Sequence, residues 1–247
     1  MKIGQFTKWN FKNGFIGMMV FYAVYLGVIS ILNIILTMQF GIGDETVSTT
    51  ISAGIYFFVI GIVYSHHNMR VGLANSISRK SIFNGTILAA LLLSILAAII
   101  NFAAGRIITL LNTQSVTLYE WLSSSMYLNQ PSNGVIYILA YLLNGIVTSL
   151  LAFLTGWFIG SAYYRMNRGL KIAVSIGVPA LLFIGLPILS AQSSAFSAAL
   201  STIFKTILNF VTLSPFYLTL FLLALCVVFT LLSWLLLRRA PVKATFS

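Results

Sequence analysis

Long apolar segments recur along this chain, separated by short polar ones. A helix that crosses a membrane needs about 20 mostly apolar residues, with a usual range of about 17–25. Only 7% of the 247 residues are charged, against about 25% in soluble domains. We therefore expect an all-α polytopic membrane protein, a single transmembrane domain over 1–247 with six transmembrane helices. The expected spans are 15–38, 47–64, 82–105, 135–160, 172–190 and 216–237.

The basic residues predict which side of the membrane each loop between the spans faces. The chain has 14 Lys and Arg against 3 Asp and Glu, and cytoplasmic loops of membrane proteins are enriched in Lys and Arg. With both termini cytoplasmic, the formal charge is +12 inside and −1 outside. This sorting by loop predicts membrane topology and no nucleic-acid partner. The inside groups are Lys2, Lys8 and Lys12; Arg70, Arg79 and Lys80; Arg165, Arg168 and Lys171; and Arg238, Arg239 and Lys243.

No expected span contains a charged residue. Transport driven by protons or sodium usually uses carboxylates within the membrane, so the chain has no evident coupling to an ion gradient. It also has no G-x-x-x-x-G-K-[ST] phosphate loop, and neither the adjacent His66 and His67 nor the lone Cys226 forms a catalytic or metal site. We expect no enzyme activity, metal or cofactor in this chain, and any use of ATP requires another polypeptide.

The polar side chains expected inside spans are neutral. Asn33, Asn101 and Asn144 either hydrogen-bond between helices or line a substrate path. Gly156 and Gly160 form a small-xxx-small pattern, which predicts close packing of the fourth span against another helix. Pro179 and Pro187 are kink sites in the fifth span.

Residues 1–14 are predicted to form an interfacial helix, because Ile3, Phe6 and Trp9 share one helical face while Lys8 and Lys12 share another.

A cytoplasmic helix is predicted between the second and third spans, where Met69, Leu73 and Ile77 recur at a spacing of four residues. This stripe either inserts into a groove of a soluble partner or lies against lipid. Arg79 and Lys80 follow it.

An amphipathic outer helix is predicted before the last span, within 191–215. Its apolar arc includes Phe196, Leu200, Ile203 and Ile207.

Together these features resemble the permease subunit of a type-2 ABC transporter, in a small bacterial exporter-like form. Residues 75–83, Asn-Ser-Ile-Ser-Arg-Lys-Ser-Ile-Phe, resemble a stretch of such permeases that has glycine where this chain has Ser76. The resemblance implies a bacterial plasma membrane, a second permease, identical or homologous, and two cytoplasmic ATP-binding subunits that hold ATP-Mg. It makes 69–80 the coupling helix, with Met69, Leu73, Ile77, Arg79 and Lys80 as docking residues, and 191–208 the outer gate helix.

The expected function is ATP-driven export of an amphipathic or hydrophobic substrate, such as an antimicrobial peptide or a lipid-like molecule. Two alternatives remain open from the sequence. One is the substrate-capture component of a vitamin-type importer, which would retain its ligand without an ATPase. The other is a membrane scaffold or sensor that transports nothing.

Overall fold

The computed structural model describes residues 3–40, 49–111, 134–185, 187–188, 194–212 and 215–238. Side chains are described over 3–28, 53–104, 138–181, 183–185, 187–188, 197–199, 201–210 and 216–238. Over these ranges the chain is helical apart from the turns at 75–78 and 166–167, and it contains no strand. Its elements are α1 (Ile3–Phe40), α2 (Thr49–Ala74), α3 (Arg79–Leu111), α5 (Gly134–Arg165), α6 (Arg168–Ala180), the π-helix η1 (Leu181–Gly185), α8 (Ser194–Thr212) and α9 (Pro215–Arg238).

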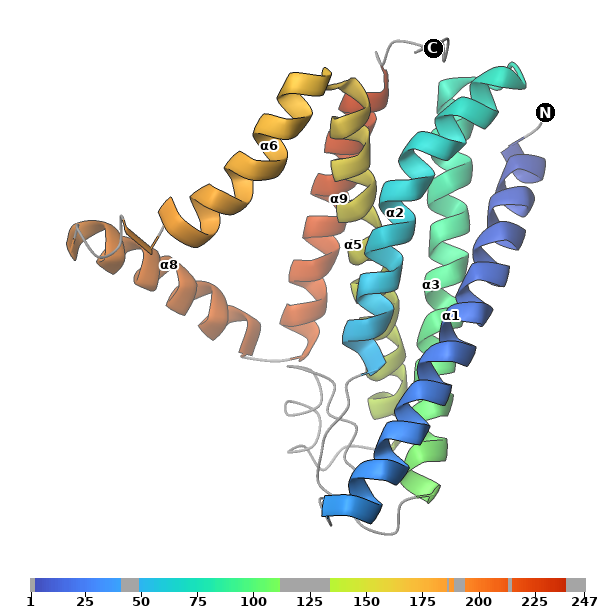
Figure 1. Cartoon of the computed structure of the whole chain (residues 1–247), viewed down its shortest axis with the longest axis vertical. Helices are drawn as coiled ribbons and strands as arrows, with labels where there is room; N and C mark the ends of the chain where they lie inside the picture. The colour runs from blue at the N-terminus through green and yellow to red at the C-terminus, as the bar shows by residue number, and fades with distance from the viewer. Residues whose placement is uncertain are drawn as a thin grey trace.

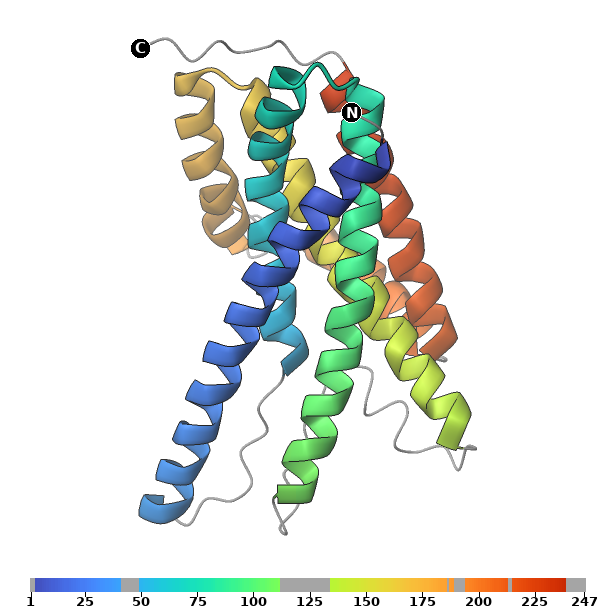
Figure 2. The same ribbon diagram turned by 90° about the vertical axis from the view of Figure 1, so that its right-hand side faces the viewer.

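The helices form a bundle and an arm. Within the bundle, α2 packs against α5 and α3, α5 also packs against α9 and α3, and α1 packs against α3. The start of α1 and the end of α9 lie at the same end of this bundle (Figures 1 and 2). The arm consists of α6, η1 and α8; it leaves the bundle after α5 and returns to it at α9 (Figure 1).

Five helices of the described part are long and apolar enough to cross a membrane, which is consistent with a multi-pass membrane protein. The helix that holds the second expected span, α2, is not among them. In its described part a polar stretch over 65–70 follows the apolar residues and lowers the mean hydropathy. The five segments are Ile3–Val28, Arg79–Ala104, Ile138–Arg165, Arg168–Gly185 and Phe216–Arg238.

The closest helix packing joins α2 to α5. A Cβ added to Gly156 would collide with the backbone of Phe58, and one added to Gly160 with Ser65 and the carbonyl of Ile62. Gly61 of α2 meets the backbone of α5 in the same way. The close packing predicted for Gly156 and Gly160 is confirmed, and α2 is the partner helix.

The N-terminal segment differs from its prediction. Residues 3–14 form no separate interfacial helix, because α1 runs without a break from Ile3 to Phe40. Phe6, Thr7, Asn10 and Gly14 form a buried face on its first turns, and Gly85 of α3 lies against Phe6 and Thr7. The segment therefore packs in the bundle, where Gly85 allows α1 and α3 to approach closely.

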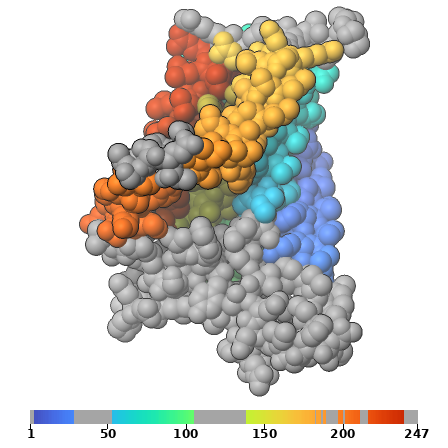
Figure 3. All heavy atoms as spheres, turned by 60° about the vertical axis from the view of Figure 1, so that its left-hand side comes forward, coloured from blue at the N-terminus to red at the C-terminus, as the bar shows by residue number. Residues whose placement is uncertain are grey.

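Pro179, in the fifth expected span, explains where the α-helix of the arm ends. Pro179 cannot donate a backbone hydrogen bond and its ring crowds the preceding turn. The α-helix accordingly ends at Ala180 and continues as the π-helix η1. No residue of α6 is buried. Figure 3 shows α6 running across the outside of the molecule and meeting α8.

Candidate functional site

The turn between α2 and α3 is built by two helix caps. The amide of Ile77 donates to the carbonyl of Gly72, and that of Ser76 to Leu73, a Schellman arrangement that ends α2. Ser76 has a φ of 54°, which this arrangement requires at its position. The hydroxyl of Ser78 then accepts from the amide of Ser81 at 3.2 Å and caps α3.

These caps replace the cytoplasmic helix predicted over 69–80. Met69 and Leu73 belong to the last turns of α2, and Ile77 lies in the turn. Met69 and Ile77 are only 2% and 4% exposed, and Leu73 packs against the same core. The predicted stripe is a packing face within the bundle, since the short turn folds α2 back onto α3. It is not an exposed stripe ready for a partner.

Arg79 and Lys80 have different surroundings. The guanidinium of Arg79 donates to the backbone carbonyl of Arg238 at 3.0 Å, so it binds the C-terminal end of α9, where the helix dipole favours a cation. Lys80 is exposed, and so is Arg70 on the last turns of α2. Of the predicted docking residues, only Lys80 therefore has an exposed side chain.

The asparagines take different roles. Tyr22 of α1 donates to the Oδ1 atom of Asn101 of α3 at 2.9 Å, and both side chains are buried. Asn101 is thus a packing residue between helices. Asn144 of α5 is also buried, and its Oδ1 atom has no partner among the described residues. The side chain of Asn33 lies outside the described residues.

Sequence reasoning missed the polar contacts that hold α1 to α2. Tyr64 donates to the backbone carbonyl of Asn10 at 3.0 Å, and the ring of Trp9 stacks on that of His67. The sequence does place Tyr64 and His67 three residues apart, on one side of α2. That α1 is the helix they contact is evident only from the helix arrangement.

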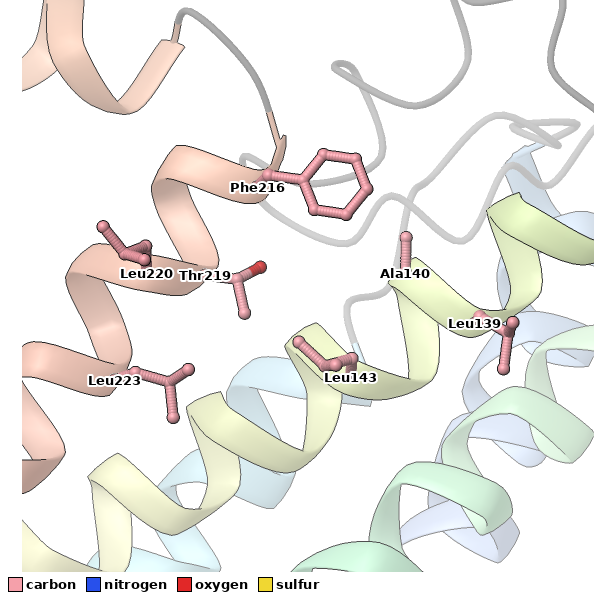
Figure 4. A pocket seen from close by; sticks show the side chains of 7 residues that line it. All are labelled: Leu139, Ala140, Leu143, Phe216, Thr219, Leu220 and Leu223. Carbon is pink, nitrogen blue, oxygen red and sulfur yellow. The ribbon is translucent and has the colours of Figure 1, made fainter.

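An apolar pocket opens between the first halves of α5 and α9 (Figure 4). Its volume of about 410 Å³ falls within the range of about 300–1,000 Å³ common for small-molecule sites. Phe216 extends from α9 toward α5, and Leu143 extends from α5 toward α9 (Figure 4). Farther along the same pair of helices, the thiol of Cys226 of α9 contacts the backbone carbonyl of Val147 of α5 at 3.9 Å. The lining is Leu139, Ala140, Leu143, Phe216, Thr219, Leu220 and Leu223.

No sequence signal distinguishes these lining residues, because they are ordinary members of apolar spans. Only the pairing of α5 with α9 reveals them.

The region predicted to hold an outer helix does contain a helix, α8. Ile203 and Ile207 are exposed on it, with fractions of 58% and 41%. The side chains of Phe196 and Leu200 lie outside the described residues. The apolar surface of α8 is thus left uncovered by the described part of the chain.

Among the described residues, no group of three or more His, Cys, Asp or Glu side chains could hold a metal ion. Comparison with known protein families, with curated proteins and with solved structures finds no match.

Proposed function

We propose that this chain is the membrane permease subunit of an ATP-driven transporter of the ABC type, and that it exports an amphipathic or hydrophobic substrate. Separate cytoplasmic subunits bind and hydrolyse ATP, and a second permease, identical or homologous, completes the translocation path. The membrane is the bacterial plasma membrane.

The observation that carries this proposal is the character of the buried polar groups. Every buried polar side chain in the described part of the chain is neutral: Thr7, Asn10, Ser65, Asn68, Thr86, Ser94, Asn101, Asn144, Ser149, Ser161, Thr219 and Ser233. Such groups can pack helices, but they cannot carry a proton or balance a sodium ion as a membrane carboxylate does. If the chain moves its substrate uphill, the energy must therefore come from another polypeptide.

The arrangement of α1 and α3 supports a crossing by α2, and therefore the proposed count of six spans. Both helices meet the criteria for a span, and both begin at the same end of the bundle, where Phe6 of α1 lies beside Gly85 of α3. The chain must return between them, and α2 is the helix that does so (Figure 2). The lower hydropathy of α2 comes from its end at the proposed cytoplasmic surface.

The apolar pocket supports a hydrophobic substrate. It lies between two helices that are both candidates for membrane spans, so a molecule could enter it from the hydrocarbon region without exposure to water. We propose that this pocket is part of the substrate path, and that α8 is the outer gate helix beside it.

The test begins with the intact chain purified from the membranes of its own host. Mass spectrometry of what remains bound should identify an ATP-binding protein in about equal molar amount. The reconstituted complex should move a hydrophobic substrate only when ATP is present.

A charged substitution at Ile77, such as Ile77→Asp, does not test docking of the ATPase. The side chain of Ile77 is buried, so the charge would destabilise the chain itself.

Two variants test the substrate path. Ala140→Phe fills the pocket and should reduce ATP-dependent export while the ATPase stays bound. Ala224→Phe adds the same volume on an exposed position of α9 and should leave export unchanged. Equal export by the two variants would remove the pocket from the path.

Other results from the purified chain would overturn the proposal. A tightly retained small molecule without an ATPase would identify a substrate-capture component. Absence of both would leave a scaffold or sensor.

A further inference from the structure

The pocket between α5 and α9 begins where both of its walls begin as candidate spans. These spans start at Ile138 and Phe216, and the lining of the pocket starts at Leu139 and Phe216. On α9 the lining continues to Leu223, about 10 Å farther along the helix. The pocket therefore extends from one end of the two spans toward the middle of the membrane (Figure 4).

The pocket also opens to the side of the bundle. Between two membrane-spanning helices, the surroundings of an exposed side chain are lipid chains and not water. A ligand therefore enters from the bilayer without passing through water. Five of the seven lining side chains are exposed in this way: Leu139, Leu143, Phe216, Leu220 and Leu223.

The lining offers almost no hydrogen bonds to a ligand. Six of its seven side chains contain only carbon and hydrogen. The seventh, Thr219, is 5% exposed and already takes part in an interaction. Asn144 has an Oδ1 atom without a partner among the described residues, but it is not part of the lining. The pocket therefore binds a ligand through apolar contact alone.

This chemistry separates the two substrate classes that the sequence left open, a peptide and a lipid-like molecule. An extended peptide in the pocket would leave backbone N–H and C=O groups unpaired, which is costly in hydrocarbon. A peptide helix pairs these groups internally, but it is about 10–12 Å wide. The volume of about 410 Å³ would hold only about one turn of such a helix. A hydrocarbon chain has no polar group to pair.

We propose that the α5–α9 pocket holds the hydrocarbon chain of a lipid-like amphiphile, whose polar group stays at the first turns of the two helices. The inference rests on the proposed function, because it names the substrate class of the proposed path. In the proposed orientation these first turns face outwards, so the chain is held in the outer half of the membrane. Since lipid chains are as apolar as the lining, binding depends on the fit between the chain and the pocket walls.

The probe is a lysophosphatidylcholine whose acyl chain carries a photoactivatable diazirine. It is added to the full chain in vesicles of phosphatidylcholine, and mass spectrometry locates the crosslinked residues after irradiation. We expect crosslinks at 139–143 and 216–223, and an excess of unlabelled lysophosphatidylcholine should displace them. Crosslinks on α6, which has no buried residue, report ordinary lipid contact and should persist.

Two variants and one competitor sharpen the test. Ala140→Phe fills the pocket and should remove the displaceable crosslinks. Ala224→Phe adds the same volume at an exposed position of α9 and should keep them. Equal melting temperatures would show that both variants are folded. The competitor needs no variant: a helical peptide of about 20 leucines and alanines, long enough to span the bilayer, should leave the crosslinks in place.

The outcomes that overturn the inference differ from those that overturn the proposed function. Pocket crosslinks that resist displacement would show ordinary lipid contact, and displacement by the peptide would show that the substrate class is wrong. If ATP-dependent export is observed without a displaceable crosslink, only this inference fails. If the chain captures no ATPase but keeps the displaceable crosslinks, the proposed function fails, and with it the claim that the bound amphiphile is a transport substrate.

Discussion

Ser76 illustrates how one backbone angle decides the local fold. Its φ of 54° lies in the left-handed region, which costs an ordinary residue about 1–2 kcal/mol and glycine almost nothing. The Schellman cap therefore favours glycine at this position on physical grounds. We predict that Ser76→Gly stabilises the chain by about 1 kcal/mol, measured as the free energy of unfolding in mixed detergent micelles.

The control for Ser76 is its neighbour Asn75, whose φ is not positive and whose side chain donates to the carbonyl of Val71 at 2.8 Å. Asn75→Gly should lower stability. If both glycines change stability alike, backbone strain at Ser76 is not the cause.

A second residue-scale prediction concerns the hydrogen bond between Tyr22 and Asn101. Tyr22→Phe and Asn101→Leu each leave a buried polar atom unpaired, which costs about 1–3 kcal/mol, whereas the double variant leaves neither. We expect a coupling energy of about 0.6 kcal/mol or more, measured by a double-mutant cycle. Tyr217→Phe, at an exposed tyrosine, should have little effect. Strictly additive losses would show that the two side chains do not stabilise each other.

At the scale of the helices, the close contact between α2 and α5 predicts opposite changes in stability for two glycine substitutions in α2. Gly61→Ala places a methyl group against the carbonyl of Phe153, and overpacking of this kind costs about 1–3 kcal/mol. Gly54→Ala on the same helix meets no described atom within 4 Å and should gain up to about 1 kcal/mol from helix propensity. Unfolding in detergent measures both, and a tolerated Gly61→Ala would contradict the close approach.

The helices themselves were predictable from the sequence because apolar length is a local property. The packing of Gly156 and Gly160 was predictable for the same reason, since small residues leave a recognisable spacing. The end of α2 was not predictable. The stripe at Met69 and Ile77 has helical spacing, but the Schellman cap that turns Ile77 inward depends on the return of α3. The pocket depends on which helices pair, and no spacing along the chain encodes that.

For the whole molecule, the span count depends on α2, and cysteine labelling can decide it. In a Cys226→Ala background, single cysteines replace Lys8, Lys80 or Lys205, which are all exposed. With six spans and both termini inside, a membrane-impermeant maleimide should label Lys205→Cys on intact cells and the other two only after permeabilisation. If α2 does not cross, Lys80→Cys becomes accessible outside while Lys205→Cys becomes protected. Labelling of both Lys8→Cys and Lys80→Cys from outside would instead indicate the inverted six-span orientation. The contact of Phe6 with Gly85 places the starts of α1 and α3 at the same end of the bundle, which is why we expect Lys8→Cys and Lys80→Cys to be labelled alike.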